Sequence, residues 1–234
     1  MAYHYEHIFM ATKKVPSDKT RVRKAPSLTE QAYTLIKDKI LSLELRPGLF
    51  LNEAALCAMT GFGRMPVHQA IQRLRMEGLI EVIPRKGLVV RFDSLHDILE
   101  LIEARLTMEP EVVALAAQRV TPEQIEELRG LLVRSKALTS QTKRDEFSQI
   151  DHAFHSLIAL AAGNKFLADA QRPLHDRSNM MWHLRVMPDD GLVVTQREHE
   201  AILEAIIKQD AQAAREAMRA HLMSLQKRIL KASV

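Results

Sequence analysis

The sequence predicts a mostly α-helical protein, in which an N-terminal winged helix-turn-helix of three helices and a β-hairpin wing precedes an all-α six-helix bundle. Two observations predict this fold class. Residues 52–91 have the pattern of helix, tight turn, helix and hairpin. From residue 93 onward, helix caps and helically spaced apolar residues recur without a convincing strand. A chain of 234 residues can give each unit its own core.

Composition indicates the class of protein and the cellular compartment to expect. The apolar and charged fractions, 47% and 26%, are those of an ordinary globular chain. No apolar run approaches the roughly 18–20 residues of a membrane helix, and no secretory signal pattern opens the sequence. Cys57 is the single cysteine, which excludes an internal disulfide and fits a reducing compartment. We therefore expect a cytoplasmic protein without a membrane partner.

The chain begins with a segment that lacks any periodic pattern. Residues 1–26 mix His, Lys, Pro and Ser, and we expect them to form a disordered basic tail. The first helix begins after Ser27, which stands three residues before Glu30 in the spacing of a capping box. This helix should end near Leu43, where the turn into the next unit follows.

A helix-turn-helix follows. Asn52 is a suitable N-cap for a short helix, and Gly61 and Gly63 supply the turn that ends it. A second helix starts near Arg64 and ends at Gly78. Its apolar residues recur at helical spacing: Val67, Ala70, Ile71 and Leu74.

The wing completes the first domain. Residues 79–83 and 88–90 read as two short strands joined by a turn at 84–87. In a winged helix-turn-helix, the second helix can enter a major groove while the wing contacts the DNA backbone. Residues 27–92 are therefore predicted to form one DNA-binding domain, whose contact residues we expect to be Arg64, Met65, His68, Gln69, Arg73, Arg85, Lys86 and Gly87.

The distribution of charge supports a polyanionic partner. Residues 1–92 hold 15 Lys and Arg against eight Asp and Glu, whereas residues 93–234 hold 18 against 21. The first part of the chain is thus cationic by seven charges and the second part is slightly acidic. Such an asymmetry is typical of a domain that binds nucleic acid in front of one that does not.

Residues 93–234 are predicted to be all-helical. Capping residues mark the starts of four helices: Ser94, Thr121, Thr195 and Asp210. With them we expect six helices, at about 95–119, from 122 onward, 145–162, 165–186, 196–208 and 211–231. Such a set of helices forms a bundle around one apolar core.

Four polar residues share the apolar faces of these helices. Asp151 and His155 stand four residues apart on one helix, and His199 and His221 lie among apolar residues on two others. Burying all four without partners would cost several kcal/mol. A shared divalent metal would satisfy them together, and one carboxylate with three neutral imidazoles suits Zn or Ni. Ordinary packing of satisfied histidines is the alternative, with His152 and His175 as spare ligand candidates.

Arg105 is a further polar residue on an apolar face. It could pair with Glu109, one helical turn later. Its planar guanidinium also suits a clamp for the carboxylate of a ligand. Spacing alone leaves both interpretations open.

These residues resemble a known family. Residues 28–91 resemble the DNA-binding domain of GntR-family transcriptional regulators, and the rest resembles the FCD effector domain of the FadR-type branch, in its shorter, VanR-like form with six helices. The matching DNA-binding motifs are Leu45-Arg46-Pro47-Gly48, Leu51-Asn52-Glu53, Arg64 with Pro66-Val67, Leu74 with Glu77-Gly78-Leu79-Ile80, and Pro84-Arg85-Lys86-Gly87. The matching effector-domain positions are Arg105 and Glu109, Asp151 with Phe154-His155, Glu198-His199 with Ile202, and His221-Leu222.

The resemblance implies a homodimer that binds a near-palindromic operator and responds to a small organic acid. It also implies that Asp151, His155, His199 and His221 hold the metal, and that Arg105 and the metal face the effector carboxylate. At the DNA surface the chain departs from the family, because His68 replaces a usual arginine and Gln69 a usual glutamate. The operator sequence should therefore differ from those of relatives.

We expect a regulator, most simply a repressor, and not an enzyme. A metal-dependent hydrolase-type enzyme fused to a DNA-binding module is one alternative, although no hydrolase-like motif accompanies the three histidines. A ligand-independent architectural DNA binder with a structural metal is the other. It predicts an operator affinity that no small molecule changes.

Overall fold

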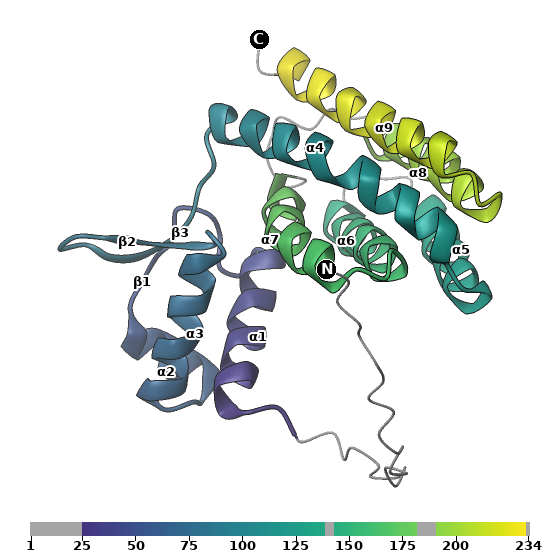
Figure 1. Ribbon diagram of the computed structural model, residues 1–234. Helices are drawn as coiled ribbons and strands as arrows, with labels where there is room; N and C mark the ends of the chain where they lie inside the picture. The colour runs from purple at the N-terminus through teal and green to yellow at the C-terminus, as the bar shows by residue number, and fades with distance from the viewer. Residues whose placement is uncertain (1–24, 139–142, 182–190, 233–234) are drawn as a thin grey trace, which may run out of the picture.

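The computed structural model describes residues 25–138, 143–181 and 191–232. Most of the predicted disordered tail lies outside these ranges, as does the predicted end of the helix at 165–186. In the described part, a small mixed domain and a helical bundle lie side by side (Figure 1). None of the described helices is long and apolar enough to cross a membrane.

The first domain is built as predicted from three helices and a wing. It contains α1 (Leu28–Leu41), α2 (Glu53–Thr60) and α3 (Arg64–Met76). Asn52 caps α2 by accepting a 2.8 Å hydrogen bond from the amide of Ala55, and Gly61 ends it in the left-handed conformation. The predicted apolar face of α3 is buried and packs on α1.

The wing contains the predicted hairpin, and a third, short strand extends it into a sheet of three strands. β2 (Ile80–Ile83) and β3 (Gly87–Val90) form the hairpin, and β1 (Phe50–Leu51) pairs antiparallel with the other edge of β3. The sheet order is β1-β3-β2. A strand of two residues is too short to show any periodicity, so its pairing with β3 was not apparent from the sequence.

The second domain is a bundle of long helices. Its described elements are α4 (Leu95–Arg119), α5 (Pro122–Lys136), α6 (Arg144–Ala161), α7 (Lys165–Met181), α8 (Gly191–Ile207) and α9 (Ala211–Ala232). The long helices α4 and α9 pack against each other, and both contact α8 (Figure 1). Ser94 and Thr121 form capping boxes, and Asp210 caps α9, as predicted.

One predicted helix start is wrong. The sequence predicts a helix that begins after the capping residue Thr195, but α8 already runs from Gly191. Thr195 is fully buried inside this helix, where its hydroxyl accepts a 3.1 Å hydrogen bond from Arg228. The spacing around Thr195 is that of a helix cap, but its hydroxyl binds a side chain of another helix instead of a backbone amide at a helix start.

The helix α7 joins the two domains. It packs against α6 and α4 of the bundle and also contacts α1 (Figure 1). Met180, near its end, is buried in the core of the DNA-binding domain rather than in that of the bundle. The two domains therefore share side chains across α7.

Candidate functional site

The predicted metal-binding residues come together inside the bundle. Asp151 and His155 lie on α6, His199 lies on α8 and His221 lies on α9. Ligand atoms of the three histidines lie within 4.8 Å of one another, and the Oδ1 atom of Asp151 lies 3.5 Å from Nε2 of His199. The packing of α4, α6, α8 and α9 around one core brings these three helices to a common point.

Several nitrogen atoms of this cluster have no partner. Both ring nitrogens of His155 and Nε2 of His199 are buried without a hydrogen-bond partner among the described residues. Unsatisfied buried polar atoms are uncommon and call for an explanation such as an ion. The donor set of one carboxylate and three imidazoles fits a divalent first-row metal.

Two neighbours orient the cluster. The Nδ1 atom of His221 lies 2.8 Å from a carboxylate oxygen of Glu198, so Nδ1 carries the proton and Nε2 is left as a ligand atom. The ring of Phe154 stacks on that of His199 at 4.4 Å between centroids. Glu198, which the sequence placed only beside a ligand, thus fixes the tautomer of His221.

Arg105 is buried beside the cluster and has the partner that spacing predicted. Its Nε atom lies 2.5 Å from Glu109 Oε1, and its Nη1 atom donates to the hydroxyl of Ser178 at 3.0 Å. Glu109 also approaches His175 Nε2 at 3.0 Å and His155 Nδ1 at 3.4 Å. The carboxylate of Glu109 therefore links the guanidinium to the imidazole of His175 and lies close to that of His155 without a hydrogen bond to it.

Burial and neighbouring charges determine the protonation states of Glu109 and the buried histidines. It lowers the pKa of His175 to about 4, despite the opposing charge of Glu109. Burial also lowers the pKa values of His199 and His221. Burial alone would raise the pKa of Glu109, but Arg105 and His175 hold it well below its usual range. At neutral pH the rings of His175, His199 and His221 are thus neutral, the form that binds metals.

A narrow cavity of about 10 Å³, room for about one water molecule, adjoins the cluster. It is lined by Arg105, Asp151, Ser178, Met181, Thr195, His221 and Leu225. Arg105 and two of the predicted metal ligands thus face the same small space.

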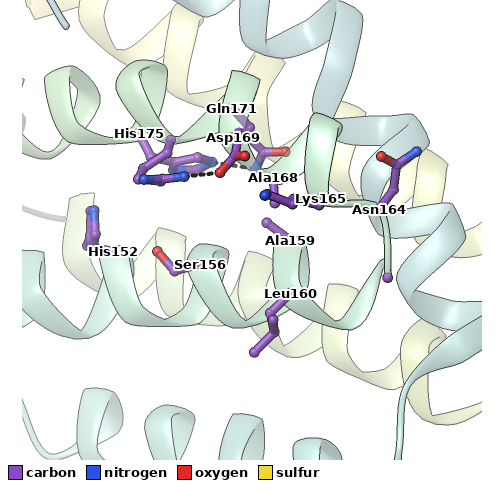
Figure 2. A pocket seen from close by; sticks show the side chains of 12 residues that line it. His152, Ser156, Ala159, Leu160, Asn164, Lys165, Ala168, Asp169, Gln171 and His175 are labelled. Atoms are coloured by element: carbon purple, nitrogen blue, oxygen red, sulfur yellow. Dashed lines mark hydrogen bonds and ion pairs between the residues drawn. The ribbon is translucent and has the colours of Figure 1, made fainter. Parts of the chain in front are cut away.

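A second, larger groove lies on the outside of the bundle. It has a volume of about 540 Å³ and runs between α6 and α7 (Figure 2). His175 lines this groove and also contacts Glu109. The groove could not be predicted from the sequence, because its walls come from the faces of two helices whose contact cannot be derived from spacing.

The predicted DNA-contact residues lie at two exposed places. Arg64, Met65, His68 and Gln69 are exposed on the first turns of α3, and Arg85, Lys86 and Gly87 form the exposed tip of the wing. Glu53 of α2 lies 2.7 Å from Nδ1 of His68 and 3.7 Å from Nε of Arg64. Glu53 therefore holds the two basic side chains of this surface next to each other.

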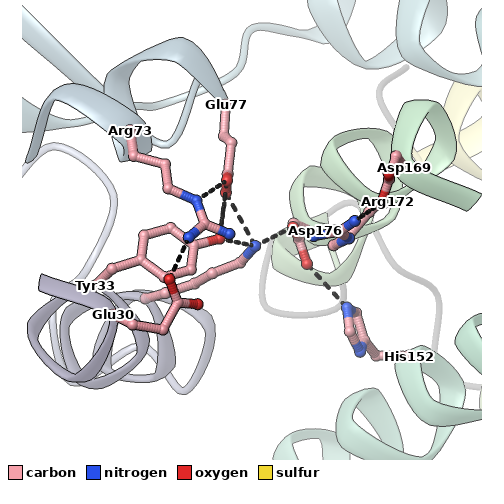
Figure 3. Close-up of polar contacts among 9 residues, drawn as sticks. Glu30, Tyr33, Arg73, Glu77, His152, Asp169, Arg172 and Asp176 are labelled. Carbon is pink, nitrogen blue, oxygen red and sulfur yellow. Dashed lines mark hydrogen bonds and ion pairs between the residues drawn. The ribbon is translucent and has the colours of Figure 1, made fainter. Parts of the chain in front are cut away.

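Arg73 differs from the other predicted contact residues. Its guanidinium lies 3.5 Å above the ring of Tyr33 and pairs with Glu30 at 2.8 Å and with Glu77 at 3.2 Å (Figure 3). Glu77 in turn pairs with Lys37 at 2.9 Å. The end of α3 is thus fixed to α1 by a network of polar side chains.

Comparison with known proteins gives two family matches and many relatives. Residues 28–90 match the description "Bacterial regulatory proteins, gntR family", and residues 100–224 match the FCD domain. The transcriptional regulator YdfH of Escherichia coli O6:H1 is 27% identical over 88% of this chain and 90% of its own length. The repressor RspR of Escherichia coli K12 is 26% identical over the same shares. The solved structure of Escherichia coli McbR/YncC has the same fold, with a TM-score of 0.76 at 20% identity over 90% of this chain and all of that one.

Proposed function

Since the chain belongs to the gntR family of bacterial regulatory proteins and carries an FCD domain, we propose that this DNA-binding transcriptional regulator is a metabolite-responsive repressor. It binds a near-palindromic operator in the cytoplasm as a homodimer, and a small organic acid changes its affinity. A similar protein, RspR, is named a repressor. The family is one of regulators and not of enzymes, as the sequence predicted.

The observation that supports the effector site is that the buried guanidinium of Arg105 faces the same cavity as Asp151 and His221, two of the predicted metal ligands. Asp151, His155, His199 and His221 hold a divalent metal, for which Zn and Ni suit the ligands. The bound metal supplies a positive charge that attracts a carboxylate. Arg105 supplies planar hydrogen-bond donors for the same carboxylate.

Ligand affects DNA binding by binding more tightly to one of two dimer geometries. In the geometry that binds DNA, the two α3 helices lie in successive major grooves, about one helical turn apart. Arg64, Met65, His68 and Gln69 then face the bases, and Arg85, Lys86 and Gly87 contact the backbone. Arg73 is engaged by two carboxylates, so we assign it the positioning of α3 in place of a base contact.

Thermal unfolding of the full chain against a panel of small carboxylates tests the effector site. A ligand of the native state raises the melting temperature as its concentration exceeds its dissociation constant. We expect a carboxylate whose effect is lost after chelation and is restored by Zn or Ni. Hits that survive chelation would remove the metal from effector binding. The absence of any hit, with an operator affinity that no ligand changes, would favour the architectural DNA binder.

Footprinting tests the DNA surface. Arg64→Ala should lose the specific footprint on an operator selected with the wild-type chain, because an arginine bound to a guanine edge contributes about 1–3 kcal/mol of discrimination. Arg75→Ala is the matched control, since Arg75 is exposed on the same helix at its other end. An unchanged footprint of the Arg64 variant would contradict the assignment.

A further inference from the structure

The groove between α6 and α7 has the features of a ligand site that is separate from the cavity at Arg105. Its volume of about 540 Å³ lies within the range of small-molecule sites. Ala159 and Leu160 of α6 and Ala168 of α7 give it apolar walls (Figure 2). None of these three residues lines the cavity beside Arg105.

A buried amide without a full set of partners lines this groove. Gln171 is only 2% exposed, and its Oε1 atom has no hydrogen-bond partner in the described structure. Figure 2 shows its side chain extending from α7 into the space between the two helices. Leaving such a polar atom unpaired costs free energy that a ligand atom would recover.

The chemistry of the neighbouring histidine determines which amide atom is free. Nε2 of His175 lies 3.0 Å from the carboxylate of Glu109 and 2.8 Å from the Gln171 amide. Since a carboxylate only accepts, Nε2 carries the proton and needs an acceptor on the Gln171 side as well. The Gln171 amide should therefore be turned over, so that its oxygen and nitrogen exchange places. Its oxygen then lies next to His175, and its NH₂ group is left without a partner. The free group is thus a donor.

The charges at the groove favour an anion. Lys165 lines it, its side chain lies between the helices in Figure 2, and it forms no ion pair within the described ranges. Arg172 and Asp169 also line the groove, but they form an ion pair with each other, so their charges cancel. Lys165 thus leaves a net positive charge on a groove that already offers a hydrogen-bond donor.

We propose that the α6–α7 groove binds a small amphipathic carboxylate. Its head takes hydrogen bonds from the Gln171 amide and faces Lys165, and its apolar body covers Ala159, Leu160 and Ala168. The site needs no metal, and it is independent of the function proposed for the cavity at Arg105. Its far end is lined by His152, which lies 2.9 Å from Asp176, the partner of Lys37 on α1. A ligand here therefore touches a residue that connects to the DNA-binding domain.

Calorimetric titration of the full, chelated chain with octanoate tests the proposal. We expect one site per chain, and a dissociation constant that rises at least about tenfold in Lys165→Gln and in Gln171→Leu. Ser156→Trp fills the groove from an exposed position on its wall and should abolish binding. Lys208→Gln, the same change at an exposed lysine outside the groove, should bind as the wild type does.

Three results would overturn the proposal. They are no binding of octanoate to the folded wild-type chain, binding that all groove variants retain, and binding that Arg105→Met abolishes but Ser156→Trp does not. The last would place the ligand in the inner cavity. Lys165 and Ser156 are exposed, so these two variants keep the test decisive if Gln171→Leu does not fold. Octanamide, which lacks the negative charge, should bind more weakly than octanoate.

Discussion

Arg105 and Glu109 form a charged pair that is almost fully shielded from water, at 3% and 1% exposure. Removing one partner of such a pair costs about 3–5 kcal/mol, because the other charge is left buried and alone. Arg105→Met should therefore lower the free energy of unfolding by about that amount. Arg105→Met combined with Glu109→Gln should lose much less, since no charge remains. Urea denaturation measures both, and equal losses in the single and double variants would contradict this account.

At the scale of residues, helical spacing predicted which polar side chains face the interior. Asp151 and His155 lie one turn apart, and His199 and His221 lie on apolar faces, so all four could be expected inside the bundle. Spacing could not predict that Glu109 and His175 join His155, or that Glu198 orients His221. Those contacts depend on how neighbouring helices are rotated and shifted against each other. The sequence pattern of a single helix does not determine this arrangement.

At the scale of elements, α7 connects the cavity proposed for the effector to the DNA-binding domain. Two of its residues face the cavity side, where His175 contacts Glu109 and Ser178 accepts from Arg105. Asp176, between them, pairs with Lys37 of α1 at 2.5 Å, and Met180 enters the first core. Lys37 also pairs with Glu77 at the end of α3 (Figure 3). A shift of α7 on binding a ligand would therefore act on the helix that precedes the wing.

This arrangement predicts that Lys37 and Asp176 couple the two sites. Lys37→Met together with Asp176→Asn should reduce the effect of metal or effector on operator affinity from the usual coupling of about 1–3 kcal/mol toward zero. Fluorescence anisotropy with labelled operator, with and without Zn or Ni, measures the ratio of affinities. Lys39→Met is the control, because Lys39 lies on the same helix and its ion pair in the described part of the chain is with the exposed Glu44. A ratio that stays unchanged in the double variant would exclude α7 as the connection.

Elements with long periodic patterns could be predicted, whereas those defined by contacts could not. The starts of α4, α5 and α9 follow from local capping residues. The start of α8 could not be predicted in this way, because Thr195 lies inside the helix and accepts a hydrogen bond from Arg228. The pairing of β1 with β3 arises only when the chain folds back at Gly48, whose amide donates to the carbonyl of Val90 at 2.8 Å.

At the scale of the whole molecule, the buried histidines make stability depend on pH. The folded-state pKa values of His175, His199 and His221 lie below the ordinary value of about 6.5, with that of His175 at about 4, because burial opposes their charging. The unfolded chain takes up protons as the pH falls through about 6.5, whereas the folded chain does not. Stability is thus fully present above about pH 6.5 and is lost as the pH falls toward the folded-state pKa values.

Each such histidine contributes up to about 1.4 kcal/mol of lost stability per pH unit in this window. For the chelated protein, the urea midpoint should therefore be nearly constant from pH 8 to 7 and should fall between pH 6.5 and 5. His199→Gln should reduce this fall, because one buried titrating ring is removed. His96→Gln should not, since His96 is exposed on α4. Added Zn should raise the midpoint most above pH 6.5, where protons no longer compete with metal for the imidazoles. A midpoint that is equal at pH 7.5 and 5 in chelator would mean that these rings do not stay neutral in the fold.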